Sequence, residues 1–262
     1  MSINTKTKSA NFSLIQGEKS LPNILKPIEK KTINYDDDNI IKSYKSISPF
    51  QERFRNADGS INTQAIEIIM GSEHNRDAYG NWLDLRYKSY DDVLADINKM
   101  EELYSNYPGF IYYNQNLYSE PFGDGTVKDC GCCQTSLAMV LSYILGDQIS
   151  PTQLLSVTAQ YYIRGEGTDV TWGCYDHVAE VFGVKTEQLD IWNDDNCIID
   201  ALEQGKPIVL AVSRGTFTGS GHYIVLLGLD MDGKIIVADP NSIGNSARTY
   251  TIEELYPQIK AI

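Results

Sequence analysis

The sequence predicts an α+β fold, and three patterns along the chain support that prediction. From 48 to 107, apolar residues recur three and four positions apart, as they do on one face of a helix. The apolar segment 135–143 follows a cluster of three cysteines at 130–133 and predicts a further helix. Near the C-terminus, three short apolar runs have the composition of β-strands, and two of them flank the turn 230–233.

Residues 1–46 are predicted to be disordered or mobile, because this stretch is polar and lacks any apolar periodicity. Residues 1–31 do not contain the continuous apolar core of a signal peptide, and no run approaches the length of a membrane span. We therefore expect no membrane span and, in the sequence as it stands, no leader. Such a chain is cytoplasmic or exported by a non-classical route, or secreted if a leader has been removed.

Residues 47–107 are predicted to form a helical appendage. Ser48 as a cap with Pro49 in the first turn is a plausible helix start. Two further helices are expected at 63–70 and 90–104, the second capped by Ser89 or Asp91. These helices are amphipathic, so their apolar faces must be buried, and the following domain offers the nearest surface.

The segment 56–62 resembles the middle of a calcium-binding loop. When Gly59 is aligned with the loop's glycine, Phe54 and Ala65 occupy the first and last ligand positions, where acidic residues are needed. We therefore interpret this segment as a turn that leads into the helix.

Residues 108–262 are predicted to form one α+β domain. A strand is expected at 110–113, and the helices and strands that follow come from apolar periodicity and alternation. Helices are expected at 135–145, 151–161, 171–182 and 196–203, and strands at 207–212, 223–229 and 234–238. The last two strands form a hairpin that pairs residue 225 roughly with residue 239.

The charge of the chain is strongly negative and unevenly distributed. The net charge is −13, and residues 108–262 contain 8 Lys and Arg against 19 Asp and Glu, a balance of −11. Such a surface repels nucleic acid and anionic lipid, and it tolerates neutral or basic peptides. We therefore expect a peptide or protein substrate and no nucleic-acid partner, with solubility as the alternative explanation of the acidity. The oligomeric state is left open.

The cysteines favour free thiols over disulfides or metal sites. An odd number with three members inside four residues makes a poor disulfide framework, the five being Cys130, Cys132, Cys133, Cys174 and Cys197. The clustered thiols lack the two-residue gap of a zinc site, and no second pair follows at finger spacing. We expect reduced thiols, one of them reactive, and neither metal nor cofactor.

Cys132 is the best candidate for a nucleophile. The periodic helix begins near Thr135, so Cys132 lies just before it, where unpaired N–H groups and the helix dipole stabilise a thiolate. Cys130 lies further out in the loop, and the side chain of Cys133 should point elsewhere. Both remain alternatives, as does the possibility that all three cysteines only fill apolar space.

His222 and Asp239 are the matching candidates for a base and its orienting carboxylate. His222 follows Gly219-Ser220-Gly221 where a loop enters a strand, and the expected hairpin brings Asp239 to the same end. His74 is expected at the surface of the appendage, and His177 on a helix. The alternatives are a core histidine at 222 and a turn-forming Asp-Pro-Asn at 239.

Gln115 is a candidate donor to an oxyanion. It ends the segment Tyr112–Gln115, seventeen residues before Cys132, and a neutral amide can stabilise the charge of a tetrahedral intermediate. Spacing alone does not distinguish it from the amides of Asn114, Asn116 and Gln134.

Four segments of 110–258 together resemble the papain-superfamily cysteine peptidases, in the stand-alone C39-like branch related to bacteriocin double-glycine leader peptidases. The segments are Tyr112–Gln115, Gly131-Cys132 with the following Thr135–Tyr143, Gly221–Val225 and Asp239–Asn241. The resemblance implies a papain-like fold, in which a helix carrying the nucleophile packs on an antiparallel sheet. It also implies that Cys132 is the nucleophile, His222 the base, Asp239 the orienting carboxylate and Gln115 the oxyanion donor.

This chain departs from the family pattern at the nucleophile. Cys-Gly-Pro is usual there, and Cys132-Cys133-Gln134 stands in its place. The transporter domain that accompanies true leader peptidases is absent, so leader processing coupled to export is not implied. We expect a cysteine peptidase acting on peptide or isopeptide bonds. The alternatives are a cell-wall amidase or acyltransferase with the same triad, and a catalytically silent binding module of the same fold.

Overall fold

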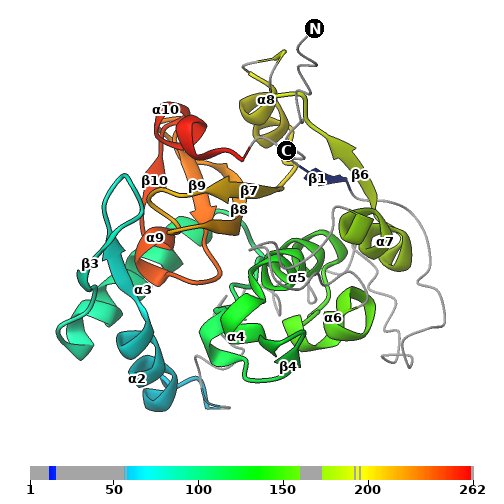
Figure 1. Cartoon of the computed structure of the whole chain (residues 1–262). Coiled ribbons are helices and arrows are strands. Elements are labelled where there is room, and N and C mark those ends of the chain that lie inside the picture. Colours follow the sequence, from blue (N-terminus) through cyan, green and yellow to red (C-terminus); the bar gives the residue numbers. More distant parts are fainter. Residues whose placement is uncertain are drawn as a thin grey trace, which may run out of the picture.

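The computed structural model has an α+β architecture built around one six-stranded antiparallel sheet (Figure 1). It describes residues 12–15, 56, 58–159, 173–191, 193–194 and 196–260. The strand order in the sheet is β10-β9-β8-β7-β1-β6. The strands are β1 (Phe12–Ile15), β6 (Lys185–Gln188), β7 (Ile208–Ser213), β8 (Gly221–Leu229), β9 (Ile235–Ala238) and β10 (Thr249–Tyr250).

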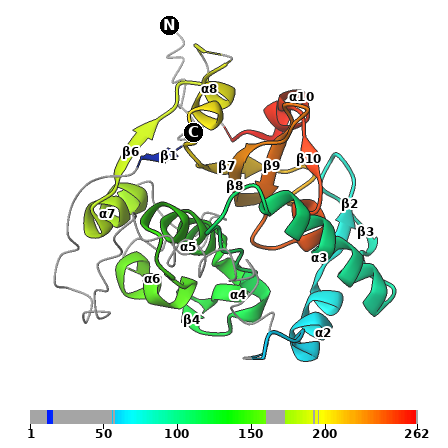
Figure 2. The same cartoon turned by 180° about the vertical axis from the view of Figure 1, so that it is seen from behind.

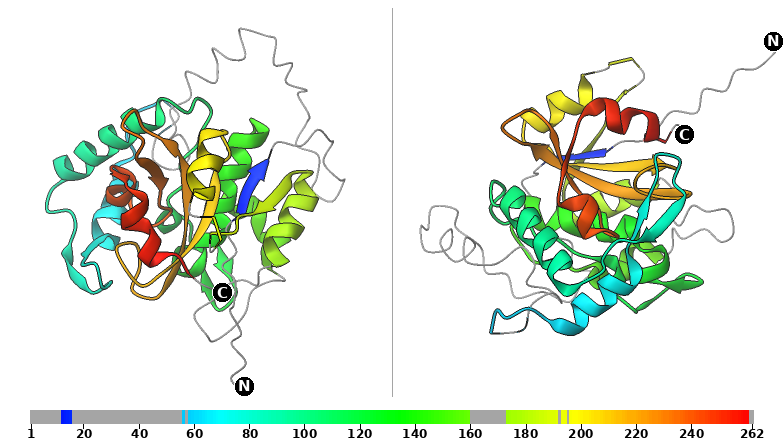
Figure 3. Two further views of the ribbon diagram at one scale, coloured as in Figure 1. Left: turned by 90° about the horizontal axis from the view of Figure 1, so that it is seen from above. Right: turned by 90° about the vertical axis from the view of Figure 1, so that its left-hand side faces the viewer.

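Both faces of this sheet are covered, because successive side chains of a strand point to opposite sides. Along β8, Tyr223, Val225 and Leu227 belong to the core cluster that includes α5 (Cys132–Leu145). Ile224 and Leu226 belong to the cluster on the other face, with α8 (Cys197–Glu203) and α10 (Ile252–Leu255). Figure 3 shows the sheet between these two layers.

The other helices of this part follow the predictions closely, with shifts at their ends. α6 (Pro151–Thr158) begins with the capping box of Ser150 and Gln153, and α7 (Gly173–Phe182) carries His177. Residues 160–161 and 171–172 of the predicted helices lie outside the described residues. The described residues also form four short helices, α4 (Val127–Cys130), α9 (Ile243–Ser246), η1 (Gln115–Leu117) and η3 (Tyr256–Gln258). A small hairpin consists of β4 (Pro121–Phe122) and β5 (Gly125–Thr126).

The hairpin of β8 and β9 has nearly the predicted register. Val225 lies opposite Ala238, one residue from the predicted partner, and the register shifts between Leu226 and Gly228. The irregularity adds a residue to one strand, which the count through the turn did not include.

The predicted strand at 110–113 is wrong, because this segment has no regular secondary structure and pairs with no strand of the described sheets. Its tyrosine hydroxyls bond to other elements instead: Tyr112 donates to the Asp239 carbonyl at 2.7 Å, and Tyr113 lies 3.4 Å from the Ser142 hydroxyl. Aromatic residues are common in strands, which is why the sequence predicts a strand here. In the structure these aromatic rings are buried in the core without any strand pairing.

The segment before the main domain contains the two predicted helices, α2 (Thr63–Ser72) and α3 (Tyr90–Tyr104), and Ser89 caps α3 with a capping box. The sequence predicts a purely helical segment, and this is wrong. β2 (His74–Arg76) and β3 (Trp82–Leu85) form a hairpin between the two helices. His74 is partly buried in this hairpin, with its ring 4.3 Å from that of Trp82. Figure 2 shows the segment beside β9, β10 and α9.

This N-terminal segment shares one core with the main domain. Ile66, Ile69, Val93 and Met100 are fully buried in the same cluster as the residues of α5. Three tyrosine hydroxyls tie the end of α3 and the following chain to carbonyls of the β8–β9 hairpin. They are Tyr104 to Val237 at 2.9 Å, Tyr107 to Leu229 at 2.9 Å, and Tyr112 to Asp239 at 2.7 Å.

Residues 12–15 differ from the expectation of a structureless stretch at 1–46. They form β1, which pairs antiparallel with β6 and with β7. A strand of four residues in a polar stretch is too short to produce a detectable apolar pattern. Its pairing partners also lie far along the chain, so no local turn signal indicates the pairing. Ser48, Pro49 and the helix predicted there lie outside the described residues. Among the helices that are described, none has both the length and the apolar character needed to cross a membrane.

Candidate active site

Cys132 is the first residue of α5, so this helix begins three residues before the predicted position. The earlier start follows from Gly131, whose carbonyl accepts hydrogen bonds from the Thr135 N–H at 2.9 Å and the Thr135 hydroxyl at 2.7 Å. A Cβ at Gly131 would lie 2.4 Å from the Val127 carbonyl oxygen, so only glycine allows this close approach. Cys132 is buried, with 5% of its surface exposed.

The other cysteines of the cluster face different surroundings. Cys133 is fully buried beside Cys174 and Tyr175, and burial, followed by the hydrogen bond to Cys174, raises the pKa of its thiol well above the usual range. The Cys130 thiol donates to the carbonyls of Thr126 at 3.3 Å and Phe122 at 3.5 Å. Burial also raises the pKa of Cys197, to about 11. Cys133 and Cys197 are therefore held as neutral thiols, which react slowly.

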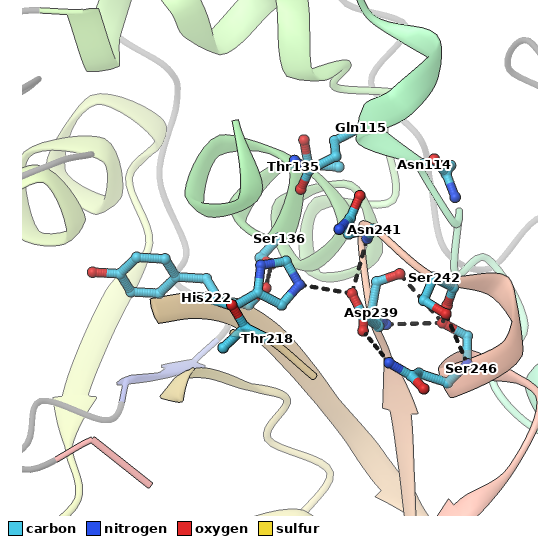
Figure 4. A network of polar contacts seen from close by, with 12 residues as sticks. Asn114, Gln115, Thr135, Ser136, Thr218, His222, Asp239, Asn241, Ser242 and Ser246 are labelled. Carbon is cyan, nitrogen blue, oxygen red and sulfur yellow. Dashed lines mark hydrogen bonds and ion pairs between the residues drawn. The ribbon is translucent and has the colours of Figure 1, made fainter. Parts of the chain in front are cut away.

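His222 lies between Asp239 and Cys132. Its Nε2 donates to Oδ1 of Asp239 at 2.7 Å (Figure 4), and the Cys132 thiol is near enough to the ring to raise the pKa of the imidazole. His222 is the second residue of β8 and Asp239 directly follows β9, so adjacent strands supply the pair. Their proximity matches the prediction from the hairpin.

The Asp239 carboxylate is fully buried and accepts three hydrogen bonds. Besides His222, Oδ1 accepts the Asn241 N–H at 2.8 Å, and Oδ2 accepts Nδ2 of Asn245 at 2.8 Å. The Asp239 backbone N–H donates to the Ser246 hydroxyl at 2.9 Å (Figure 4). These contacts fix the orientation of the carboxylate, and hence the position of its oxygen relative to His222.

The surroundings of His222 favour its charged form. Burial lowers the pKa of the imidazole, but the Asp239 charge, the hydrogen bond to Asp239 and the Cys132 thiol together outweigh burial and raise that pKa to about 10. A buried imidazolium beside a thiol is an arrangement that stabilises a thiolate.

Gln115 lies close to the start of the helix that carries Cys132. Its Nε2 donates to the Lys128 carbonyl at 2.9 Å in α4, the helix directly before Gly131. Its backbone N–H donates to the Pro240 carbonyl at 2.7 Å, next to Asp239. The bond to Lys128 uses one of the two N–H groups of the amide, and Oε1 is buried without a partner among the described residues.

The competing amides are used differently. Oδ1 of Asn114 accepts the backbone N–H and Nδ2 of Asn116, and Asn116 also donates to Oδ1 of Asn241 at 2.9 Å. Both amides therefore support the loop after Asp239. Both amide atoms of Gln134 are buried without a partner among the described residues.

Sequence reasoning missed several residues of this site. Asn245 and Ser246 hold Asp239, and Glu73, from the N-terminal segment, binds the loop before them. Asn245 and Ser246 follow Asp239 by only six and seven residues, so a local signal existed for them. Ser242, directly after Asp-Pro-Asn, is a potential helix cap and indicates a short helix that could return side chains to Asp239. For Glu73 no local signal exists. Within the described ranges, no three His, Cys, Asp or Glu side chains are grouped to hold a metal ion.

Comparisons with known proteins identify the family. No curated protein and no solved structure matches the chain. The model of the Peptidase C39 like family matches residues 107–261, more than half of the chain, and includes Cys132, His222, Asp239 and Gln115. Its match supports a cysteine-peptidase-like function at the level of the family. The chain belongs to the Peptidase C39 like family.

Proposed function

We propose that this protein is a cysteine peptidase that hydrolyses peptide or isopeptide bonds. Cys132 is the nucleophile, His222 the general base and acid, Asp239 the orienting carboxylate and Gln115 a donor to the oxyanion. One observation carries the proposal: a buried imidazole from β8 interacts with the Cys132 thiol and with a fully buried carboxylate. The helix α5 supplies the thiol, the strand β8 supplies the imidazole, and the residue directly after β9 supplies the carboxylate.

We extend the proposal to the fold, which is papain-like. The helix that begins with Cys132 packs against the sheet that carries His222, and the Ser136 hydroxyl donates to the Tyr223 carbonyl at 3.2 Å across that contact. This bond ties the helix to the strand one residue after His222. The relative position of thiol and imidazole is thereby held by the core rather than by a loop.

Acylation uses the imidazole as proton acceptor and donor. Because Nε2 is bound to Asp239, Nδ1 is the nitrogen that takes the proton from the Cys132 thiol. The thiolate attacks the carbonyl carbon of the substrate, a C–S bond forms, and the oxygen becomes an oxyanion. The imidazolium then protonates the leaving nitrogen as the C–N bond breaks, which releases the amine and leaves a thioester.

Deacylation reverses these roles. His222 takes a proton from a water molecule, and the resulting hydroxide attacks the thioester carbonyl. The C–O bond forms, the C–S bond breaks, and Cys132 leaves as the thiolate beside the imidazolium. The carboxylic acid product departs, and the charged pair that opened the cycle is restored.

The oxyanion is stabilised by two donors. The first donor is a backbone N–H in the first turn of α5, the helix that begins with Cys132. Such N–H groups have no carbonyl partner within the helix and can therefore bind the oxyanion. The second donor is the remaining N–H of the Gln115 amide, beside the carbonyl of Lys128 that fixes its orientation.

The test combines thiol labelling with peptide cleavage in the full chain. Limiting iodoacetamide at about pH 6 should modify Cys132 before the other cysteines. Cys132→Ala should abolish cleavage of a mixture of unstructured peptides, followed by mass spectrometry, and Cys133→Ala, a change at the neighbouring buried thiol, should retain it. Uniform slow labelling without cleavage would indicate a silent module. Rapid labelling of Cys132 without peptide cleavage would favour amidase or acyltransferase chemistry.

A further inference from the structure

Glu73 is a buried carboxylate outside the part of the chain that matches the family model. It directly follows α2, and 3% of its surface is exposed. Its backbone is held on both sides, since its N–H donates to Ile69 at 3.0 Å and its carbonyl accepts the Arg86 N–H at 3.0 Å. The roles proposed above for Cys132, His222, Asp239 and Gln115 do not include this residue.

The Glu73 side chain binds the start of α9 in the main domain. Oε1 accepts the Ile243 N–H at 2.6 Å, and Oε2 accepts the Ser242 hydroxyl at 2.9 Å and the Gly244 N–H at 3.3 Å. Glu73 therefore takes up two backbone N–H groups that a four-residue helix leaves without internal partners.

The surrounding residues fix this contact. A Cβ at Gly244 would lie 1.5 Å from Nε of Arg86, so the absence of a side chain there lets the guanidinium lie against α9. Burial raises the pKa of Glu73 to about 7, although the Ile243 N–H, the Ser242 hydroxyl and the charge of Arg86 act against burial. Above that pH the carboxylate is ionised and can accept all three bonds.

The far end of α9 holds Asp239. Asn245 donates its amide to the Asp239 carboxylate at 2.8 Å, and the Ser246 hydroxyl accepts the Asp239 N–H at 2.9 Å. The Ser242 N–H also donates to the Asp239 carbonyl at 3.2 Å. One helical turn thus joins Glu73 at one end to Asp239 at the other (Figure 4 shows the α9 side of this network).

We propose that Glu73 is a positioning residue for the active site, acting through α9 on the carboxylate that orients His222. Through this contact the N-terminal segment helps to position the side chains of the active site. A single helical turn is not stable by itself, because nucleation is unfavourable, so α9 depends on contacts from outside. When an amide replaces the Glu73 carboxylate, only one oxygen remains as an acceptor. One of the buried N–H groups of Ile243 and Gly244 then loses its partner, and the turn must shift to find another.

This inference rests on the proposed function for its kinetic readout, and a spectroscopic readout is independent of turnover. The proton between Nε2 of His222 and Asp239 should give a strongly downfield proton NMR signal. At about pH 8, where the wild-type carboxylate is ionised, that signal should move or broaden in Glu73→Gln, and Cys132 should be alkylated more slowly. The kcat for peptide cleavage should fall roughly 10- to 100-fold with little change in KM.

Glu67→Gln is the matched control, since Glu67 is exposed on α2, the helix that Glu73 follows, and the chemical change is identical. It should leave the NMR signal, the alkylation rate and kcat unchanged. Glu73→Asp keeps the charge and shortens its reach, so it should give an intermediate loss, and it serves if near-ultraviolet circular dichroism shows that Glu73→Gln does not fold.

A double variant tests the route through α9. If Glu73 acts on Asp239 through Asn245, Glu73→Gln should cause little further loss of kcat, and little further change of the NMR signal, in an Asn245→Ala background. Folded Glu73 variants with an unchanged His222 signal and alkylation rate would overturn the inference, as would fully additive losses. If the wild-type protein cleaves no peptide, the proposed function fails, and the NMR and alkylation results still decide the role of Glu73.

Discussion

Replacing Asp239 with alanine should remove most of the stabilisation of charged His222. The pKa of His222 is raised from the ordinary 6.5 to about 10, which corresponds to about 5 kcal/mol in favour of the imidazolium. Asp239 supplies this by its charge and by a hydrogen bond of 2.7 Å, together with the Cys132 thiol. Once the carboxylate is gone, burial dominates, and the pKa of His222 should fall below its ordinary value.

The effect is measured as the rate of Cys132 alkylation by iodoacetamide across pH, alongside peptide cleavage. In Asp239→Ala, alkylation at about pH 6 should slow by an order of magnitude or more, because a neutral imidazole stabilises the thiolate less. Turnover should fall by roughly 10²- to 10⁴-fold. Asp239→Asn should retain more activity than Asp239→Ala, since an amide oxygen can still accept the hydrogen bond from His222.

The variant also loses stability, which the experiment must separate from the chemical effect. The Asn241 N–H and the Asn245 amide would be left without their buried acceptor, at a cost of about 1–3 kcal/mol each. Asp232→Ala, at an exposed position in the turn of the same hairpin, is the control and should behave as wild type. A folded Asp239→Ala protein with normal turnover and an unchanged alkylation profile would refute the triad and leave a Cys-His dyad.

Two further changes separate charge in the transition state from charge in the resting site. Gln115→Ala should lower kcat by roughly 10²- to 10³-fold and leave the alkylation rate of Cys132 unchanged, because an oxyanion donor acts on charge that forms only during the reaction; slower alkylation would assign Gln115 to the resting site instead. The stability that His222 contributes should be fully present below about pH 6.5 and lost as pH rises towards 10, since its pKa is higher in the folded state. The free energy of unfolding, from urea titrations at pH 7 and pH 10, should therefore fall less in His222→Gln than in wild type, and equal falls would contradict the raised pKa.

Local patterns in the sequence were enough to select the residues that meet at the site. The place of Cys132 before an apolar helix predicts a nucleophile there, and the glycines that precede its strand indicate His222 as the base. Counting residues through the hairpin turn predicts that Asp239 lies at the same end as His222. Each of these arguments needs only a short window of sequence, and the hairpin joins two windows through a single turn.

Contacts between distant windows could not be predicted in the same way. Ser242 and Glu73 are 169 residues apart, and their bond depends on how α2 and α9 meet in the folded core. The strand at 12–15 could not be predicted for the same reason, since its partners in β6 and β7 lie far along the chain. The error at 110–113 is different, because aromatic residues favour a strand locally and are buried here by contacts with other elements.

The three tyrosine hydroxyls at the end of α3 and beyond act as an optical reporter of how this segment is joined to the sheet. Burial raises the pKa of Tyr104 and of Tyr112 well above the usual range, and it also raises that of Tyr107. In solutions alkaline enough to ionise exposed phenols, these three should remain neutral for as long as they donate to Val237, Leu229 and Asp239. Burial raises the pKa of Tyr87, Tyr175 and Tyr250 too, so the part of the delayed absorbance change that belongs to the three reporters is the part lost when Tyr104, Tyr107 and Tyr112 are replaced by phenylalanine. That part should mark the moment when the chain leading from α3 to Gln115 separates from the β8–β9 hairpin.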